Sequence, residues 1–171
     1  MSPVPDMEVS TMQIQSTRFG TIDIADDAVI EFADGIIGLP GTRYALVAQQ
    51  EGSSFYWLHS IDDPSVALPV TQPWLFFPSY DVAVSDEDSA KLGLDSAEEA
   101  DVFCVVRAAQ ELEEFTVNLR GPIVVHASRR LGRQVINEAG DYDVRQPLFA
   151  HVELSQAQPA NSTTPIAATG V

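Results

Sequence analysis

The side chains best suited to acid–base or nucleophilic chemistry are few and scattered along this chain. Its three histidines, His59, His126 and His151, are far apart in the sequence. None of them belongs to an HxH or HExxH pattern, the spacings from which metal sites are often built. Cys104 is the only cysteine and lies in the apolar run DVFCVVRA, with no adjacent base to activate it. We therefore expect an inert buried thiol, no catalytic residues, no metal site and no cofactor.

Two neighbouring carboxylates, Asp62 and Asp63, occur in the stretch SIDDPS. Such a pair could act as general acid and base. Directly before Pro64, however, the pattern is more typical of a turn in which an aspartate accepts hydrogen bonds from backbone amides. We expect this turn. For the same reason we expect Asn118 to bond backbone groups at a bulge or corner, and not to polarise a substrate.

A glycine-rich stretch, GIIGLPG, covers residues 35–41. It has neither the lysine nor the strand–loop–helix context of a phosphate-binding loop. We expect a loop with positive φ at Gly35, Gly38 or Gly41, in which Pro40 fixes a turn.

The charge of the chain restricts its partners. The 171 residues carry 25 acidic and 9 basic side chains, a net charge of −16. Such a chain is repelled by nucleic-acid phosphates and by anionic lipid, and is attracted to basic proteins. A local basic spot at Arg129, Arg130 and Arg133 has no interleaved aromatic residues, so we expect these arginines to pair with acids of this protein or of a partner. We expect no direct nucleic-acid binding and no membrane binding.

The location of the protein is also suggested by the sequence. The N-terminal stretch MSPVPDMEVSTM lacks the charged and apolar regions of a signal peptide. No apolar run approaches the roughly 20 residues that a membrane span needs. The single cysteine suits a reducing compartment. We expect a cytoplasmic protein.

The elements that must position these residues are mainly β-strands. Apolar and polar residues alternate, and turn signals recur at the spacing typical of a sandwich or a barrel. We expect strands within residues 11–20, 21–26, 28–32, 44–50, 55–61, 66–76, 81–85, 101–110, 114–119 and 123–128. Pro69 and Pro73 indicate an edge, a bulge or a corner in the sixth of these segments.

One short helix is expected in SDEDSAKLGL, capped by Ser85 or Asp86 and ended by Gly93, and a second turn near residues 96–100. Residues 86–114 hold ten acids against two basic residues, and form the most acidic part of the chain. We expect one domain over residues 9–154, with a flexible tail at 1–8 and a disordered tail at 155–171.

Four blocks of the sequence, in this order, resemble the FliW family of flagellar assembly factors. The resemblance covers residues 16–148, and its blocks are TRFGTIDI, IEFADGIIGLPG, FYWLHSIDDPSVALPVTQPWLFFPSYDV and FTVNLRGPIVVHASRRLGRQVI. It implies a mainly β fold: a small, single-domain, antiparallel β-barrel-like structure with one or two short helices. It also implies that the TVNLRGPIVV stretch is framework, a strand, a Gly-Pro corner and a second strand.

The resemblance further implies a function without catalysis. Proteins of this family bind the translational repressor CsrA, a small basic RNA-binding dimer, and keep it from its messenger targets. They also bind flagellin, near its C-terminal helical region. Export of flagellin releases the FliW-type protein, which then sequesters CsrA and permits flagellin translation. We expect the same partners here, and a monomer.

Site residues follow from charge and from the resemblance. We expect partner binding by exposed acids of the helix, of the following segment and of the SIDDP turn: Asp62, Asp63, Asp86, Glu87, Asp88, Glu98, Glu99 and Asp101. We expect framework roles for the loop, turn and corner residues: Gly35, Gly38, Pro40, Gly41, Pro64, Asn118, Gly121 and Pro122.

The sequence departs from the family pattern at three places. Thr42 and Arg43 replace an aromatic and an acid, His59 replaces a glutamine, and a neutral tail follows Leu154.

A different class of function is also open. A small β-barrel could bind a small ligand in its mouth, as a binding protein or as an enzyme, with the pocket lined by aromatic side chains. The candidates are Tyr56, Trp57, Trp74, Phe76, Phe77 and Tyr80. The same residues would equally suit core positions on alternating strands, which we consider the better interpretation.

Overall fold

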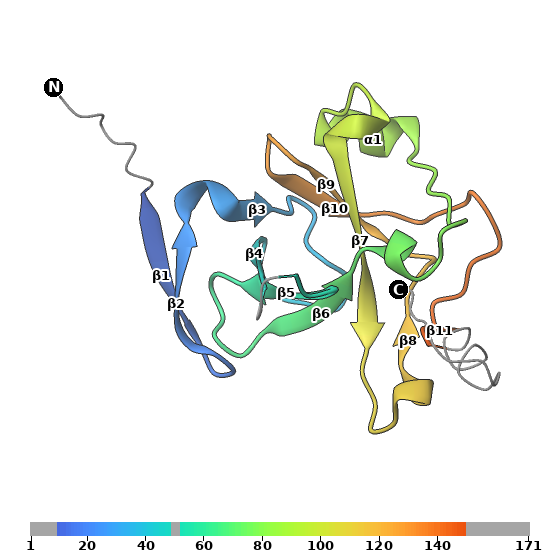
Figure 1. Cartoon of the computed structure of the whole chain (residues 1–171). Coiled ribbons are helices and arrows are strands. Elements are labelled where there is room, and N and C mark those ends of the chain that lie inside the picture. Colours follow the sequence, from blue (N-terminus) through green and yellow to red (C-terminus); the bar gives the residue numbers. More distant parts are fainter. Residues whose placement is uncertain (1–9, 49–51, 150–171) are drawn as a thin grey trace, which may run out of the picture.

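The computed structural model describes residues 10–48 and 52–149 of the chain (Figure 1). The predicted tails, residues 1–8 and 155–171, lie outside the described residues, as does the end of the strand expected at 44–50. Within the described part the fold is mainly β, with a single α-helix and short 3-10 turns.

Seven strands close into a barrel, because β7 pairs both with β6 and with β9. Around the barrel the strands are β7 (Ala100–Arg107), β6 (Ala67–Thr71), β5 (Phe55–Ser60), β4 (Arg43–Val47), β3 (Val29–Glu31), β10 (Leu131–Gln134) and β9 (Ile123–His126). Two shorter strands, β8 (Thr116–Val117) and β11 (Gln146–Pro147), extend from β7. The expected barrel-like class is confirmed.

One pair of neighbours corrects the expectation of an antiparallel barrel. β3 and β10 run parallel and pair through a single position, Leu131 with Glu31. An odd number of strands cannot alternate in direction all the way round a closed ring, so seven strands require one parallel pair. The parallel pair occurs between two strands that are distant in the sequence and joined by no hairpin.

The interior of the barrel is filled by side chains from alternating strand positions. Its buried members are Ile30, Phe32, Ile36, Tyr44, Leu58, Val70, Phe103, Ile123 and Val125. Pro69 lies on the part of β6 that has no β7 partner, as a proline in a strand requires, and Pro73 begins the 3-10 turn η2 (Pro73–Leu75). The strand expected over residues 66–76 therefore ends at a corner.

Separate elements cover the outer faces of the barrel (Figure 1). The hairpin of β1 (Thr11–Ser16) and β2 (Gly20–Ala25) packs Ile14 and Ile24 against Ala45 of β4. The helix α1 (Asp86–Leu92) packs Leu92 against buried residues of β7, β9 and the segment after β10. A third cluster around Tyr80 and Cys104 lies beside β8 and β11.

The helix forms as its sequence predicts. The Ser85 hydroxyl accepts a hydrogen bond from the Asp88 N–H, and Gly93 ends the helix in the left-handed conformation at φ 73°. The second expected turn is the 3-10 turn η3 (Ala97–Glu99). Two further 3-10 turns are η1 (Asp26–Ala28) and η4 (Leu112–Glu114).

The strand expected at residues 81–85 does not form, which is a correction. Its backbone bonds side chains instead of a neighbouring strand. The Ala83 N–H donates to Asn137 Oδ1 at 3.0 Å, and the Asp81 N–H donates to the Tyr142 hydroxyl at 3.0 Å. The strands β10 and β11 were not expected from the sequence.

Candidate functional site

His59, one of the three histidines, is a buried anchor. Its Nδ1 lies 2.8 Å from the Ser60 carbonyl, which can only accept, so Nδ1 carries the proton and Nε2 accepts from the Ser16 hydroxyl at 2.8 Å. Ser16 Oγ in turn accepts from the N–H groups of Arg18 and Phe19. A Ser–His pair of this kind resembles an activated nucleophile, but His59 is fully buried and Ser16 is 7% exposed. The pair ties the β1–β2 hairpin to the barrel.

His126 and Cys104 are also held by the fold. The His126 Nδ1 accepts from the backbone N–H groups of Ser128 and Arg129, so its Nε2 proton faces Glu99 Oε1, 3.7 Å away. Cys104 is buried, as expected, and burial raises the pKa of its thiol to about 12. His151 lies outside the described residues. Among residues 10–48 and 52–149, no three His, Cys, Asp or Glu side chains gather into a group that could hold a metal ion.

The glycine-rich loop adopts the expected backbone. Gly35, Gly38 and Gly41 have φ of 75°, 83° and 83°. The Tyr44 hydroxyl donates to the Pro40 carbonyl, and the Ile37 N–H donates to Gln134 Oε1 at 3.2 Å. These bonds hold the loop against the end of the barrel.

The two neighbouring carboxylates form a turn. Asp63 Oδ1 accepts from the Ser65 N–H at 3.0 Å and from its hydroxyl at 2.8 Å, and these bonds lower the pKa of Asp63. Asp62 pairs with Arg43 at 2.6 Å. The expected Asx-type turn before Pro64 is confirmed, and Arg43, a departure from the family pattern, has a partner within the chain.

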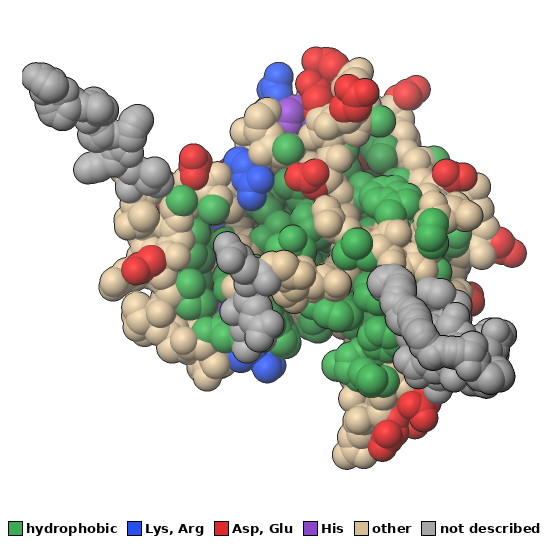
Figure 2. Space-filling model, viewed as in Figure 1, with side chains coloured by type: hydrophobic (Ala, Val, Ile, Leu, Met, Phe, Trp, Pro, Cys, Tyr) green, Lys and Arg blue, Asp and Glu red, His purple; other side chains and the backbone are tan. Residues whose placement is uncertain are grey.

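Six of the eight acids predicted to bind partners lie at one end of the molecule, on α1, η3 and the start of β7. Figure 2 shows acidic side chains gathered there, at the top of the view. Asp62 and Asp63 lie elsewhere, on the turn between β5 and β6. We refer to Asp86, Glu87, Asp88, Glu98, Glu99 and Asp101 as the acidic end.

Three members of the acidic end are engaged within the chain. Asp88 pairs with Arg133, which also pairs with Asp34 and lowers the pKa of that carboxyl. Glu87 pairs with Lys91 at 3.4 Å.

Glu99 accepts hydrogen bonds from the N–H groups of Asp95 and Ser96 at 2.7 and 3.3 Å. The bond from Asp95 has the larger effect, and both bonds lower the pKa of the Glu99 carboxyl. Asp86, Glu98 and Asp101 are exposed and have no ion-pair partner within 4.0 Å among the described residues.

A groove of about 550 Å³ lies beside the acidic end, and we call it the acidic groove. Its lining includes the apolar residues Val82, Val102 and Val124, and the acids Asp81 and Asp95. Trp74, 42% exposed, also lines it. Sequence reasoning missed Asp81 and Asp95 as site residues, although Asp95 belongs to the acidic segment 86–114 and Asp81 lies shortly before it.

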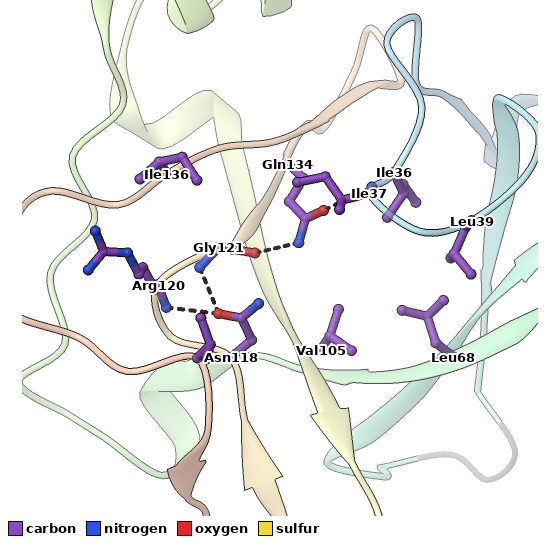
Figure 3. Close-up of a pocket in the computed structure, with 11 residues that line it drawn as sticks. Ile36, Ile37, Leu39, Leu68, Val105, Asn118, Arg120, Gly121, Gln134 and Ile136 are labelled. Carbon is purple, nitrogen blue, oxygen red and sulfur yellow. Dashed lines mark hydrogen bonds between the residues drawn. The ribbon is translucent and has the colours of Figure 1, made fainter.

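A second groove, of about 460 Å³, opens at the end of the barrel, and we call it the apolar groove (Figure 3). Its floor consists of Ile36, Leu39, Leu68 and Val105, which also pack on the barrel interior. Its edge is formed by residues from the glycine-rich loop, from the corner after β8 and from the segment after β10. These are Ile37, Asn118, Arg120, Gly121, Gln134, Ile136 and Val144.

Asn118 supports the wall of the apolar groove. Its Oδ1 accepts from the N–H groups of Arg120 and Gly121 at 3.0 and 2.8 Å (Figure 3). Gln134 Nε2 donates to the Gly121 carbonyl at 3.0 Å. The expected bonding of Asn118 to backbone at a corner is confirmed.

The six aromatic residues considered for a ligand pocket do not line one common pocket. Tyr56 packs inside the barrel against Phe103, whereas Trp57 packs outside it against Phe19. Phe76 and Phe77 pack in the cluster around Cys104. Trp74 and Tyr80 line the acidic groove, and none of the six lines the apolar groove.

The three arginines of the basic spot have three different roles. Arg133 pairs with Asp88 and Asp34, as expected for pairing within the chain. Arg130, at φ 56°, donates to two backbone carbonyls. The side chain of Arg129 lies over Gly93.

No helix in the described residues has the length and apolar character to cross a membrane.

The comparisons with known proteins all match the same kind of protein. A family model described as "FliW protein" matches residues 13–148. The flagellar assembly factor FliW of Magnetococcus marinus is 38% identical over 147 residues, which cover 85% of this chain and 90% of that protein. The flagellar assembly factor FliW of Thermotoga neapolitana is 37% identical over 146 residues, covering 84% and 98%.

A solved structure shares the fold. The crystal structure of a flagellar assembly factor FliW superposes with a TM-score of 0.73 at 26% sequence identity, covering 80% of this chain and 96% of that one.

Proposed function

This chain belongs to the FliW family, and we propose that it is a cytoplasmic flagellar assembly factor that binds the repressor CsrA and flagellin and performs no catalysis. The relatives that it matches are named flagellar assembly factors, and the match covers nearly their whole length. By holding CsrA away from messenger RNA, the protein permits flagellin synthesis. By binding flagellin, it links that synthesis to the amount of unexported flagellin.

The observation that carries this proposal is the acidic end with the acidic groove beside it. Unpaired carboxylates attract a basic protein from a distance, and an apolar floor next to them supplies area that can be buried on contact. CsrA is the basic partner. Asp86, Glu98 and Asp101 are the members of the acidic end that have no ion-pair partner among the described residues, so we assign the contact to them.

Calorimetric titration into CsrA tests the proposal directly. The wild-type chain should bind, and binding should weaken when salt is raised from about 50 to about 200 mM, because salt screens exposed charges. Replacing Asp86 and Glu98 by lysine should lower affinity at least about tenfold and flatten the salt dependence.

The matched control replaces Glu113 and Glu114 by lysine. These acids are equally exposed but lie on η4, at the far tip of the β7–β8 connection (Figure 1). The control has the same change in net charge, so it should retain most of the affinity. Equal losses in both variants would reduce the effect to overall charge, and no CsrA binding by the wild type would remove the proposal.

Flagellin provides the second arm of the test. Adding purified flagellin to the complex with CsrA should release CsrA in proportion to the flagellin added. If flagellin binds this protein without releasing CsrA, the proposed exchange of the two partners would be wrong, although both contacts would exist.

A further inference from the structure

The edge of the apolar groove exposes large apolar side chains. Ile37 is 77% exposed, Ile136 is 53% exposed and Val144 is 54% exposed. They come from three separate segments and line the same groove, with Asn118, Arg120 and Gln134 among them, so they form a mixed rim and not scattered surface residues. Such a rim around a groove is typical of a surface that docks another chain.

The polar atoms that line the groove differ in whether they are already hydrogen-bonded. The acceptors are in use: Asn118 Oδ1 by two backbone N–H groups, Gln134 Oε1 by the Ile37 N–H, and the Gly121 carbonyl by Gln134 Nε2. The Asn118 amide nitrogen has no bond to the surrounding residues in Figure 3. The Asn118 amide therefore remains available as a donor, whereas Gln134 Oε1 and the Gly121 carbonyl, each already bonded once, keep a second lone pair.

The cation at the groove has no partner. Arg120 is exposed and has no carboxylate within 4.0 Å among the described residues, although the chain carries 25 acids. It lies at the edge of the groove, near Ile136 (Figure 3). An unpaired guanidinium beside spare amide donors is suited to a carboxylate.

We propose that the apolar groove docks an amphipathic helical segment of a partner protein, with apolar side chains along one face and a carboxylate at one end of that face. The apolar face would cover the floor and rim, and the carboxylate would meet Arg120 and the Asn118 amide. A helix fits better than an added strand, because both the N–H and the carbonyl of Gly121, in the middle of the groove wall, are already bonded.

This inference extends beyond the proposed function, since it assigns a second docking site with the opposite charge preference. The acidic groove favours a basic surface, whereas the apolar groove favours an acidic segment. It does not depend on which natural partner supplies that segment.

Two synthetic helical peptides test the proposal by fluorescence anisotropy. Both carry leucines at positions i, i+4 and i+7, and they differ only in one residue at the end of that face, glutamate in one and lysine in the other. The full-length protein should prefer the glutamate peptide by about tenfold at about 150 mM salt, which screens the general repulsion by the acidic chain. Replacing Arg120 by glutamate should reverse this preference.

Matched controls separate the groove from the rest of the surface. Ile136→Ser should weaken both peptides at least about fivefold, whereas Leu112→Ser, an equally exposed residue on η4, should leave both unchanged. Arg18→Glu makes the same charge change as Arg120→Glu on the distant β1–β2 hairpin, and should keep the glutamate preference. All of these positions except Arg18 lack tertiary bonds through their side chains, and unchanged circular dichroism would verify folding.

Several outcomes would overturn the proposal. Equal binding of the two peptides, or binding of neither, would exclude a carboxylate-bearing helix as the occupant. Displacement of the peptide by a synthetic copy of residues 155–171 would assign the groove to this chain's own C-terminal segment. A wild-type dimer that dissociates in Ile136→Ser, measured by sedimentation, would assign it to a second copy.

Discussion

At the scale of single residues, the packing of the barrel interior leaves no room for a side chain at Gly132. A Cβ placed there would lie 2.5 Å from Phe32 Cε2 and 2.9 Å from Ile30 Cγ2. Both neighbours are fully buried, so neither can move aside freely. We expect Gly132→Ala to lower the free energy of unfolding by about 1–3 kcal/mol, the range for overpacked cores. Urea denaturation measures this, and Gly38→Ala, which has open space but positive φ, separates crowding from backbone strain.

Ser16 gives a second prediction at this scale. Its hydroxyl is the partner of the buried His59 Nε2, so Ser16→Ala leaves a buried ring nitrogen without a bond. We expect a loss of about 1–3 kcal/mol, with faster amide exchange confined to the β1–β2 hairpin. Exchange that increases evenly over the barrel would mean that the pair does not act locally.

At the scale of elements, the sequence predicted what depends on local pattern. The α1 helix begins at a serine cap and ends at a glycine, and both signals are visible in the sequence. The barrel strands were recognised as short runs of apolar residues, and β9 (IVVH) is buried along its whole length. Residues 81–85 alternate apolar and polar residues as a strand would, yet their backbone bonds the side chains of Asn137 and Tyr142, more than 50 residues away. No local pattern reveals such partners.

Strand β10 and the candidate site also depend on partners that are distant in the sequence. β10 has the sequence LGRQ, which lacks strand-forming residues, and it is positioned by pairing with β9 and by packing on Phe32. The acidic end was predicted from composition. Whether Asp88 is already paired depends on Arg133, which also pairs with Asp34 just before the glycine-rich loop, and these contacts are a matter of tertiary structure.

The turn η3 carries a prediction about pH. The folded protein lowers the pKa of Glu99 below its ordinary value of 4.5, so its stabilisation is present above that value and is lost as the pH falls through the folded pKa. We expect Glu99→Gln to be less stable than the wild type at pH 7, and the difference to shrink as the pH is lowered below 4.5. Urea midpoints at several pH values measure this, and a difference that stays constant as the pH falls would contradict it.

At the scale of the whole molecule, barrel closure rests on a narrow contact. β3 and β10 share one paired position, and Arg133 links β10 to both α1 and the loop after β3. We expect Arg133→Met to speed amide exchange in β3 and β10 while the β1–β2 hairpin stays protected. Arg107→Met, at an exposed arginine without an ion pair among the described residues, is the control and should change neither.

The two tryptophans lie on different outer layers of the barrel, and this gives each a separate optical role. Trp57 contacts Phe19 and Arg18 of the β1–β2 hairpin, whereas Trp74 lines the acidic groove and donates to the Tyr80 carbonyl. A Trp57→Phe chain therefore emits only from the acidic groove, and a Trp74→Phe chain only from the hairpin. The protein thus contains two built-in tryptophan reporters, one at the acidic groove and one at the β1–β2 hairpin, without an attached dye.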